Sequence, residues 1–220
     1  MHSEVFGIPI TNKTLEQMPE YSKKKNITRT DRAHVALKMK NAQEKDFNAR
    51  QHVELLKKEW GIGVSTLCLI YNATGDTITY ITSHNYYGHL YGPEYTKEIA
   101  NGQWGAFLHV KSIGEAVGST AVVVYRGKNE AEQECDWLLG WSNPWNRSSW
   151  DNMVYTEIKE AKHYDNGDLW GGIATEMYKC GQSKSVKWNG CLSYVSTGSY
   201  TSPIFEAIMT LKDADEDPIL

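Results

Sequence analysis

The feature that most constrains the fold is a series of eight short apolar segments that begins at residue 64. Each is rich in β-branched or aromatic residues and is bounded by turn residues such as Asn101-Gly102. Segments of this kind predict strands, and many short strands joined by tight turns predict an antiparallel β-sandwich or barrel. The predicted strands are VSTLCLIY (64–71), DTITYITSH (76–84), WGAFLHV (104–110), TAVVVYRG (120–127), DWLLGWS (136–142), NMVYTEI (152–158), CLSYV (191–195) and PIFEAIMTL (203–211).

The residues before this series follow a helical pattern instead. Apolar residues recur at spacings of four and three between Thr30, which suits an N-cap, and Gly61, which suits a helix end, with Asp46 interrupting the stripe. Such a stripe predicts a helix packed on the core of its own domain. Shorter helices are predicted over 11–21 and 169–180. The stripe consists of Val35, Met39, Ala42, Ala49, Val53, Leu56 and Trp60.

We therefore predict a mainly β protein with a single domain over residues 1–220. An N-terminal helical segment (1–61) packs on a β-sandwich (62–212), a short helix lies between late strands, and residues 213–220 form a solvated acidic tail. No stretch rich in Pro, Gly or Ser divides the chain.

Composition excludes several classes of function. No apolar run approaches the roughly 18 residues of a membrane-spanning helix. The N-terminus has neither a basic nor a long apolar region, so no secretory signal is predicted and a cytoplasmic location is expected. Residues 1–60 carry 12 Lys/Arg, but 8 Asp/Glu are mixed among them, which does not resemble a nucleic-acid-binding surface.

The residues of an enzyme or metal site do not appear in any familiar grouping. The seven histidines form no HExxH motif, the four cysteines form no CxxC pair, and no P-loop or GxSxG motif is present. We predict no catalytic residues, no metal and no cofactor. Cys180 and Cys191 flank one loop, and whether they form a disulfide is left open because a reducing cytoplasm opposes it.

Half of the eight tryptophans fall between residues 135 and 155. Trp137, Leu139 and Trp141 occupy every second position of a predicted strand, and the two tryptophans are expected in the core. Pro144 ends that strand, which places Trp145 and Trp150 on a polar turn. Large rings on such a turn form either a binding surface or a plug that folds back onto the protein.

Seven segments carry a resemblance to a known family: FGIPI (6–10), MPEY (18–21), DRAHVALK (31–38), LCLIYNATGDT (67–77), NGQWGAFLHVK (101–111), VVYRG (123–127) and SNPWNRSSWDNMVYTEI (142–158). Through them the chain resembles the plant 23-kilodalton jasmonate-induced proteins over most of its length. The resemblance implies a stress-induced protein with an actinoporin-like fold, related in shape to sea-anemone cytolysins and to a mushroom protein that binds sphingomyelin–cholesterol membranes.

In that wider group a proline, an aromatic residue and an Asp or Asn lead into a loop that contacts lipid head groups. Pro144-Trp145-Asn146 and Trp150 look like the counterpart, and Tyr125 occupies a position where the group places an aromatic residue near its head-group pocket. Cytolysins insert an apolar N-terminal helix, whereas the region 30–61 is heavily charged. The resemblance therefore supports binding more than pore formation.

These observations predict a non-enzymatic stress or defence protein that binds lipid head groups or glycans through its aromatic loop. Two alternatives remain: a pore-forming toxin, and a structural or storage homo-oligomer that buries the tryptophan loop between subunits. The predicted ligand contacts are Trp145, Trp150 and Tyr125 through their rings and Asn146, Arg147 and Asn152 through hydrogen bonds.

Overall fold

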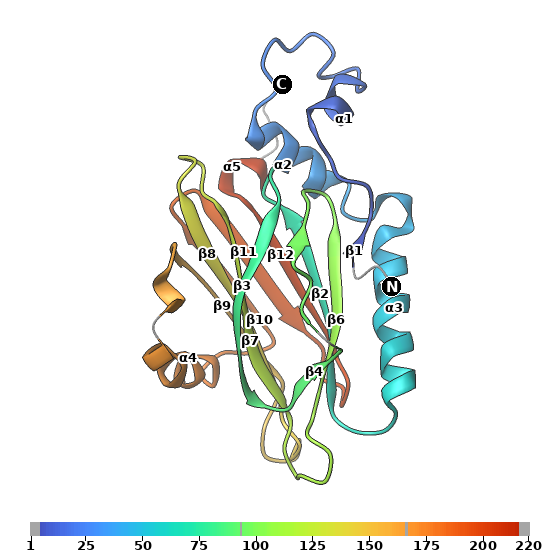
Figure 1. The fold of residues 1–220 in the computed structure, drawn as a ribbon, viewed down its shortest axis with the longest axis vertical. Helices are drawn as coiled ribbons and strands as arrows, with labels where there is room; N and C mark the ends of the chain where they lie inside the picture. The colour runs from blue at the N-terminus through green and yellow to red at the C-terminus, as the bar shows by residue number, and fades with distance from the viewer. Residues whose placement is uncertain (1–4, 93, 166, 216–220) are drawn as a thin grey trace.

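The computed structural model describes residues 5–92, 94–165 and 167–215. Two sheets pack face to face, and helices cover their outer faces (Figure 1). The seven-stranded sheet contains β1 (Val5–Phe6), β2 (Ser65–Ala73), β4 (His89–Tyr91), β6 (Trp104–Val110), β10 (Ser183–Trp188), β11 (Cys191–Thr197) and β12 (Ile204–Leu211). The five-stranded sheet contains β3 (Ile78–Tyr87), β5 (Glu98–Ile99), β7 (Ser119–Lys128), β8 (Glu134–Asn143) and β9 (Met153–Glu160).

The predicted mainly β sandwich is confirmed, and each of the eight predicted strands corresponds to one of these. The prediction of a wholly antiparallel arrangement is wrong at one place, because β12 runs parallel to β2 with Ile204 opposite Leu67. The four strands that were not predicted are β1, β4 and β5, which have only two or three residues, and β10, in which only Val186 and Trp188 are apolar.

The single predicted helix over 30–61 is two helices, α2 (Arg29–Lys38) and α3 (Lys45–Trp60). A 3₁₀ turn, η1 (Ala42–Glu44), separates them, and Glu44 at its end has a left-handed φ of 57° that no α-helix accommodates. The N-cap is Thr28, two residues before the predicted one. The Asp31 backbone N–H donates to Thr28 Oγ1, and the Asp31 carboxylate accepts from the Thr28 backbone N–H in a capping box.

The shorter helices are α1 (Asn12–Glu16), which ends before the predicted residue 21, α4 (Trp170–Met177), which lies within the predicted 169–180, and α5 (Lys212–Asp215). The 3₁₀ turns η2 (His163–Asp165) and η3 (Gly167–Leu169) precede α4.

The start of the predicted acidic tail is packed rather than solvated. Ala214 of α5 is buried against Ala33 and Leu211, and its carbonyl oxygen lies 3.0 Å from Nδ1 of His34. Apolar contacts thus hold α5 against α2 despite its acidic neighbours. The predicted tail residues 216–220 lie outside the described residues.

Three layers of apolar packing hold the molecule together. Trp137 and Trp141 are buried between the two sheets, as predicted. The apolar stripe of the N-terminal helices covers the outer face of the seven-stranded sheet, where Val35 and Val53 are buried. On the outer face of the five-stranded sheet, Ile173 and Met177 of α4 complete a smaller cluster. None of the described helices combines the length and the apolar composition that crossing a bilayer requires.

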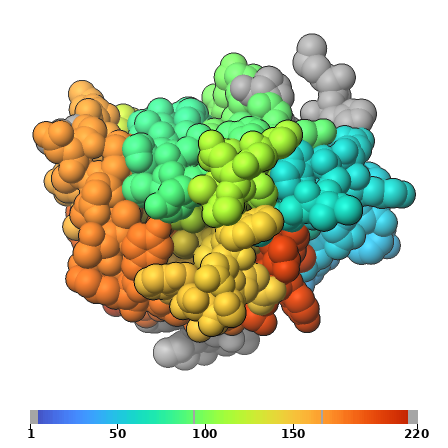
Figure 2. Space-filling view, turned by 90° about the horizontal axis from the view of Figure 1, so that it is seen from below, coloured from blue at the N-terminus to red at the C-terminus, as the bar shows by residue number. Residues whose placement is uncertain are grey.

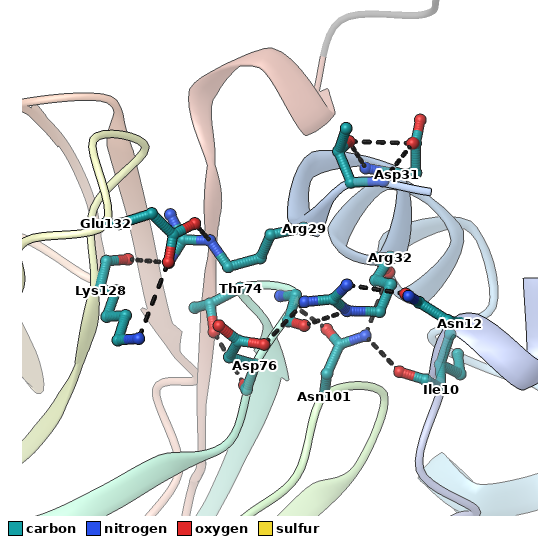
Figure 3. A network of polar contacts seen from close by, with 12 residues as sticks. Ile10, Asn12, Arg29, Asp31, Arg32, Thr74, Asp76, Asn101, Lys128 and Glu132 are labelled. Carbon is teal, nitrogen blue, oxygen red and sulfur yellow. Dashed lines mark hydrogen bonds and ion pairs between the residues drawn. The ribbon is translucent and has the colours of Figure 1, made fainter. Parts of the chain in front are cut away.

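Arginine side chains fasten α2 to the turns of the sandwich (Figure 3). The Arg32 guanidinium donates to the Gly75 carbonyl, to the Asp76 carboxylate and to the Asn12 side chain, at 2.7–2.8 Å. The Asn101 amide donates to the carbonyls of Ile10 and Arg32 at 3.0 and 3.1 Å. These bonds link the N-terminal segment to the β2–β3 and β5–β6 connections, so the segment is an integral part of the fold.

Candidate functional site

Strand register brings several connections together at one end of the sandwich, at the bottom of Figure 1 and facing the viewer in Figure 2. Ser65 at the start of β2 pairs with Val110 at the end of β6, and Ser119 at the start of β7 pairs with Asn143 at the end of β8. The α3–β2 (61–64), β6–β7 (111–118), β8–β9 (144–152), α4–β10 (178–182) and β11–β12 (198–203) connections, with the end of β3, therefore form what we call the loop end.

Exposed apolar side chains gather at the loop end. Eleven large hydrophobic residues are exposed in the described part of the chain, and seven of them lie here. Scattered exposed apolar residues are ordinary, but a contiguous group indicates a contact surface. The most exposed are aliphatic, Ile62 at 104% and Ile113 at 86%. The seven residues are Ile62, Tyr87, Ile113, Trp145, Trp150, Tyr178 and Tyr200.

A groove of about 600 Å³ opens among the aromatic residues of the loop end, and we call it the aromatic groove. Two hydroxyls that belong to its lining, on Thr120 and Ser142, lie 3.2 Å apart. Burial, with a contribution from Tyr87, raises the pKa of Tyr178, so its phenol is a neutral donor at pH 7. The groove is lined by Tyr87, Ala116, Val117, Gly118, Thr120, Ser142, Pro144, Trp145, Asn146, Trp150 and Tyr178.

The aromatic groove brings together the two tryptophans that the sequence singled out. Trp145 is 49% exposed and Trp150 is 59% exposed, so neither ring is a buried plug. Asn146 belongs to the same lining, although its side chain also bonds Ser148 and Ser149 within the loop.

Trp145 also borders a second groove, of about 460 Å³, together with Ile62 and Arg147. The Lys111 ammonium lies 4.9 Å from the centre of the Trp145 ring, within reach of a cation–π contact. The Arg147 guanidinium donates to the Ser199 carbonyl and, at 3.2 Å, to Thr201 Oγ1. Positive charge therefore lies beside the exposed tryptophan.

Two asparagine amides hold the base of the β8–β9 loop. The Asn143 amide donates to the carbonyls of Ser65 and Thr201, at 2.7 and 3.0 Å. The Asn152 amide donates to the carbonyls of Gly198 and Tyr200, at 2.8 and 2.9 Å. The prediction that Asn152 donates to a ligand is wrong for this structure, because both amide hydrogens are used and the residue is only 3% exposed.

The predicted head-group contact through Tyr125 is also wrong. Tyr125 is 0% exposed and lies between the sheets, where its hydroxyl donates to the Thr96 carbonyl at 2.9 Å. Strand alternation puts it on the same inward face as Ala121 and Val123. Sequence reasoning missed five other exposed residues of the loop end. Ile62, Ile113 and Tyr200 could have been found, because each is a large apolar residue within a turn that contains Gly or Ser. Tyr87 and Tyr178 have no local sequence feature that marks them as exposed.

One hydrogen-bonded chain has the composition of a nucleophile–histidine–amide triad. The Ser119 hydroxyl lies 2.8 Å from Nδ1 of His109, and Nε2 of that ring lies 3.1 Å from Oδ1 of Asn85. Ser119 and His109 are both completely buried, so no substrate reaches the hydroxyl in this structure. In the part of the chain that the structure describes, no three His, Cys, Asp or Glu side chains are grouped to hold a metal ion.

Known proteins with similar sequences and structures support the fold described above. The model of a family described as Nakanori-like protein matches residues 6–212. The 23 kDa jasmonate-induced protein of Hordeum vulgare is 42% identical over 204 residues, which cover 92% of this chain and 95% of that protein. The jasmonate-induced protein homolog of Atriplex canescens is 30% identical over 119 residues, covering 51% of this chain and 63% of that one.

A solved structure is similar over the same region. The crystal structure of the lipid-binding protein Nakanori superposes with a TM-score of 0.84 at 34% identity and covers 93% of this chain and 98% of its own. The resemblance that the sequence carries to the jasmonate-induced proteins is thereby confirmed.

Proposed function

The chain belongs to the Nakanori-like protein family, and we propose that it binds lipid surfaces through the loop end without catalysing a reaction. The solved relative with the same fold is a lipid-binding protein, and the curated relatives are jasmonate-induced proteins. These likenesses support a binding protein of plant stress responses.

The observation that carries the proposal is the gathering of seven exposed apolar side chains at one end of the sandwich. They come from separate connections, so a broad surface contacts them together more readily than a small ligand does. Proteins bind sugars through stacked aromatic rings and free hydrogen-bonding groups, whereas the Ile62 and Ile113 side chains provide only aliphatic surface. Lipid is therefore favoured over glycan, since aliphatic side chains gain free energy by leaving water for a bilayer interface.

The aromatic groove suits the head group of a zwitterionic lipid. The faces of tryptophan and tyrosine rings attract quaternary ammonium groups, and Trp145, Trp150 and Tyr178 supply such rings. Arg147 lies on the far side of Trp145, where its guanidinium can pair with a phosphate. Asn146 would add hydrogen bonds from the rim of the same groove.

Attachment without insertion fits the N-terminal helices better than pore formation does. The buried Lys45 at the start of α3 donates to the Tyr71 hydroxyl at 3.0 Å and to the Gly102 carbonyl at 2.9 Å. Arg50 and Lys40 both pair with Glu206 of β12. Lifting these helices would break all of these bonds and expose the apolar outer face of the seven-stranded sheet.

The test is a double variant, Trp145→Ala/Trp150→Ala, in flotation with sphingomyelin–cholesterol vesicles. Each ring is about half exposed, so burying the rest is worth about 0.75–1.5 kcal/mol, half of the value for a fully buried large side chain. Together they predict an affinity lower by roughly 10- to 150-fold. The matched control is Phe47→Ala/Leu55→Ala, which removes comparably exposed apolar side chains from α3 (52% and 57%) and should bind like the wild type.

Equal binding by the wild type and a correctly folded tryptophan double variant would refute the proposal. A tryptophan fluorescence shift with soluble glycans but not with vesicles would indicate a lectin. Release of a trapped dye would indicate a pore, and concentration-dependent light scattering that Trp150→Ala abolishes would indicate an oligomer that buries this loop.

A further inference from the structure

Two buried cysteines face one another across the sandwich. Cys135 lies on β8 of the five-stranded sheet and Cys191 lies on β11 of the seven-stranded sheet, and their sulfur atoms are 3.7 Å apart. Both are 0% exposed and both are free thiols. Cys180, the partner that the sequence suggested for Cys191, lies instead at the end of α4, where its thiol lies 3.3 Å from the Glu176 carbonyl.

We propose that Cys135 and Cys191 form a disulfide that joins the two sheets when the protein meets a peroxide. A disulfide bond is about 2.05 Å long, so each sulfur has to move by less than about 1 Å from its present position. A change of this size needs only small side-chain rotations. The pairing therefore joins residues that are far apart in the sequence without rearranging either sheet.

The site lies at the end of the sandwich opposite the loop end. Cys135 pairs with Gly127 at the end of β7, and Cys191 pairs with Leu211 at the end of β12, whereas both of those strands begin at the loop end. The two cysteines each follow a turn, and the turns are in contact. A Cβ atom on Gly190 would collide with the Glu130 carboxylate, whose other oxygen accepts from the Asp213 backbone N–H.

Access to the thiols comes from local opening of these turns. Strand ends next to turns open more readily than strand centres, and β8 and β11 both expose their cysteines when the first residue pairs separate. The hydrogen bond with Cys191, together with burial, raises the pKa of Cys135, which keeps the thiol protonated in the closed state. Oxidation is therefore expected to be slow and to depend on opening.

The reaction balances with the peroxide as the two-electron acceptor. A thiolate of one cysteine attacks one oxygen of the peroxide, so an S–O bond forms and the O–O bond breaks. The attacked oxygen stays on sulfur as a sulfenic acid, and the other oxygen leaves as hydroxide, which takes up a proton to become water. The second thiol then attacks the resulting sulfenic sulfur, so the S–S bond forms and the S–O bond breaks. That step releases a second water, and the two thiols have lost two hydrogens in total.

The expected consequence is a more stable protein with an unchanged loop end. The bond joins residues 56 positions apart and restricts the unfolded chain accordingly. For a chain of this size we expect the Tm of the oxidised protein to exceed that of the reduced protein by about 5–10 °C. Vesicle binding should be the same in both states, because the bond lies at the far end from the aromatic groove.

The experiment treats the full chain with hydrogen peroxide or with a dithiol reductant. Intact mass should fall by about 2 Da for the two hydrogens lost, and a non-reducing peptide map should join Cys135 to Cys191. The Tm difference should vanish in Cys135→Ala and in Cys191→Ala and persist in Cys68→Ala and Cys180→Ala. A map that joins Cys180, the addition of oxygen atoms without a cross-link, or a Tm that does not respond to oxidation would overturn the proposal. None of these outcomes depends on whether lipid is bound.

Discussion

Replacing Arg29 with alanine is expected to lower the free energy of unfolding by about 3–5 kcal/mol, because two carbonyls lose a charged donor and a buried side chain is removed at once. The side chain is 5% exposed, and its guanidinium donates to the carbonyls of Lys128 and Asn129 at the β7–β8 turn. Nε also lies 3.2 Å from the Glu132 carboxylate, an ion pair that is not aligned as a hydrogen bond. Truncation removes one donor from each of these carbonyls, although the Asn129 carbonyl still accepts from the Glu132 backbone N–H, and it creates a cavity.

The matched control for Arg29 is Arg50→Ala. Arg50 also projects from an N-terminal helix and pairs with a carboxylate, Glu206, but its side chain is 42% exposed. Exposed pairs contribute up to about 1 kcal/mol, so urea unfolding should separate the two variants clearly. Arg29→Lys, which keeps the charge and loses the planar fork, should fall between them. Equal losses of unfolding free energy in Arg29→Ala and Arg50→Ala would show that the contacts of Arg29 with the β7–β8 turn stabilise the protein no more than an exposed ion pair does.

Arg29 also shows where sequence reasoning reaches its limit. A basic residue in the first turn of a helix is ordinarily solvated, and nothing local indicates that Arg29 reaches a turn 99 residues later. The strands were predictable because their apolar runs and turns are local features. Trp145 and Trp150 were separable from Trp137 and Trp141 because Pro144 and polar neighbours mark the end of the strand.

The loop end could be predicted only in part. The sequence identifies its tryptophans, but the aromatic groove also needs Tyr87 from β3 and Tyr178 after α4, which only the topology brings near them. Tyr125 illustrates the opposite error. Its place in a family pattern indicated a ligand contact, although its alternation with Val123 along β7 indicates the core. Likewise, the order of the strands in the two sheets brings Cys135 and Cys191 together, and no local sequence pattern predicts that they are neighbours.

Acid is expected to destabilise the protein through His109, by about 3 kcal/mol between pH 7 and pH 4. Complete burial, with a repulsive contribution from His89, lowers the pKa of His109 to about 3. Its hydrogen-bond partners Ser119 and Asn85 are neutral, as is the Trp141 ring beside it. In the unfolded chain the imidazole has a pKa of about 6.5, so between pH 6.5 and 3 the unfolded state binds a proton that the folded state excludes.

The sign of this effect follows from that difference. The stabilisation is fully present above about pH 6.5 and is lost as pH falls toward 3, because protons then favour unfolding. Urea unfolding at pH 7, 5.5 and 4 should show the decline in wild type and a decline smaller by about 3 kcal/mol in His109→Gln, whose amide keeps hydrogen-bonding capacity but does not titrate. His163→Gln, a change on a partly exposed histidine of η2, serves as the control and should follow wild type. If His109→Gln loses stability with acid as steeply as wild type, the decline arises from other groups, and the burial of the His109 imidazole is not its cause.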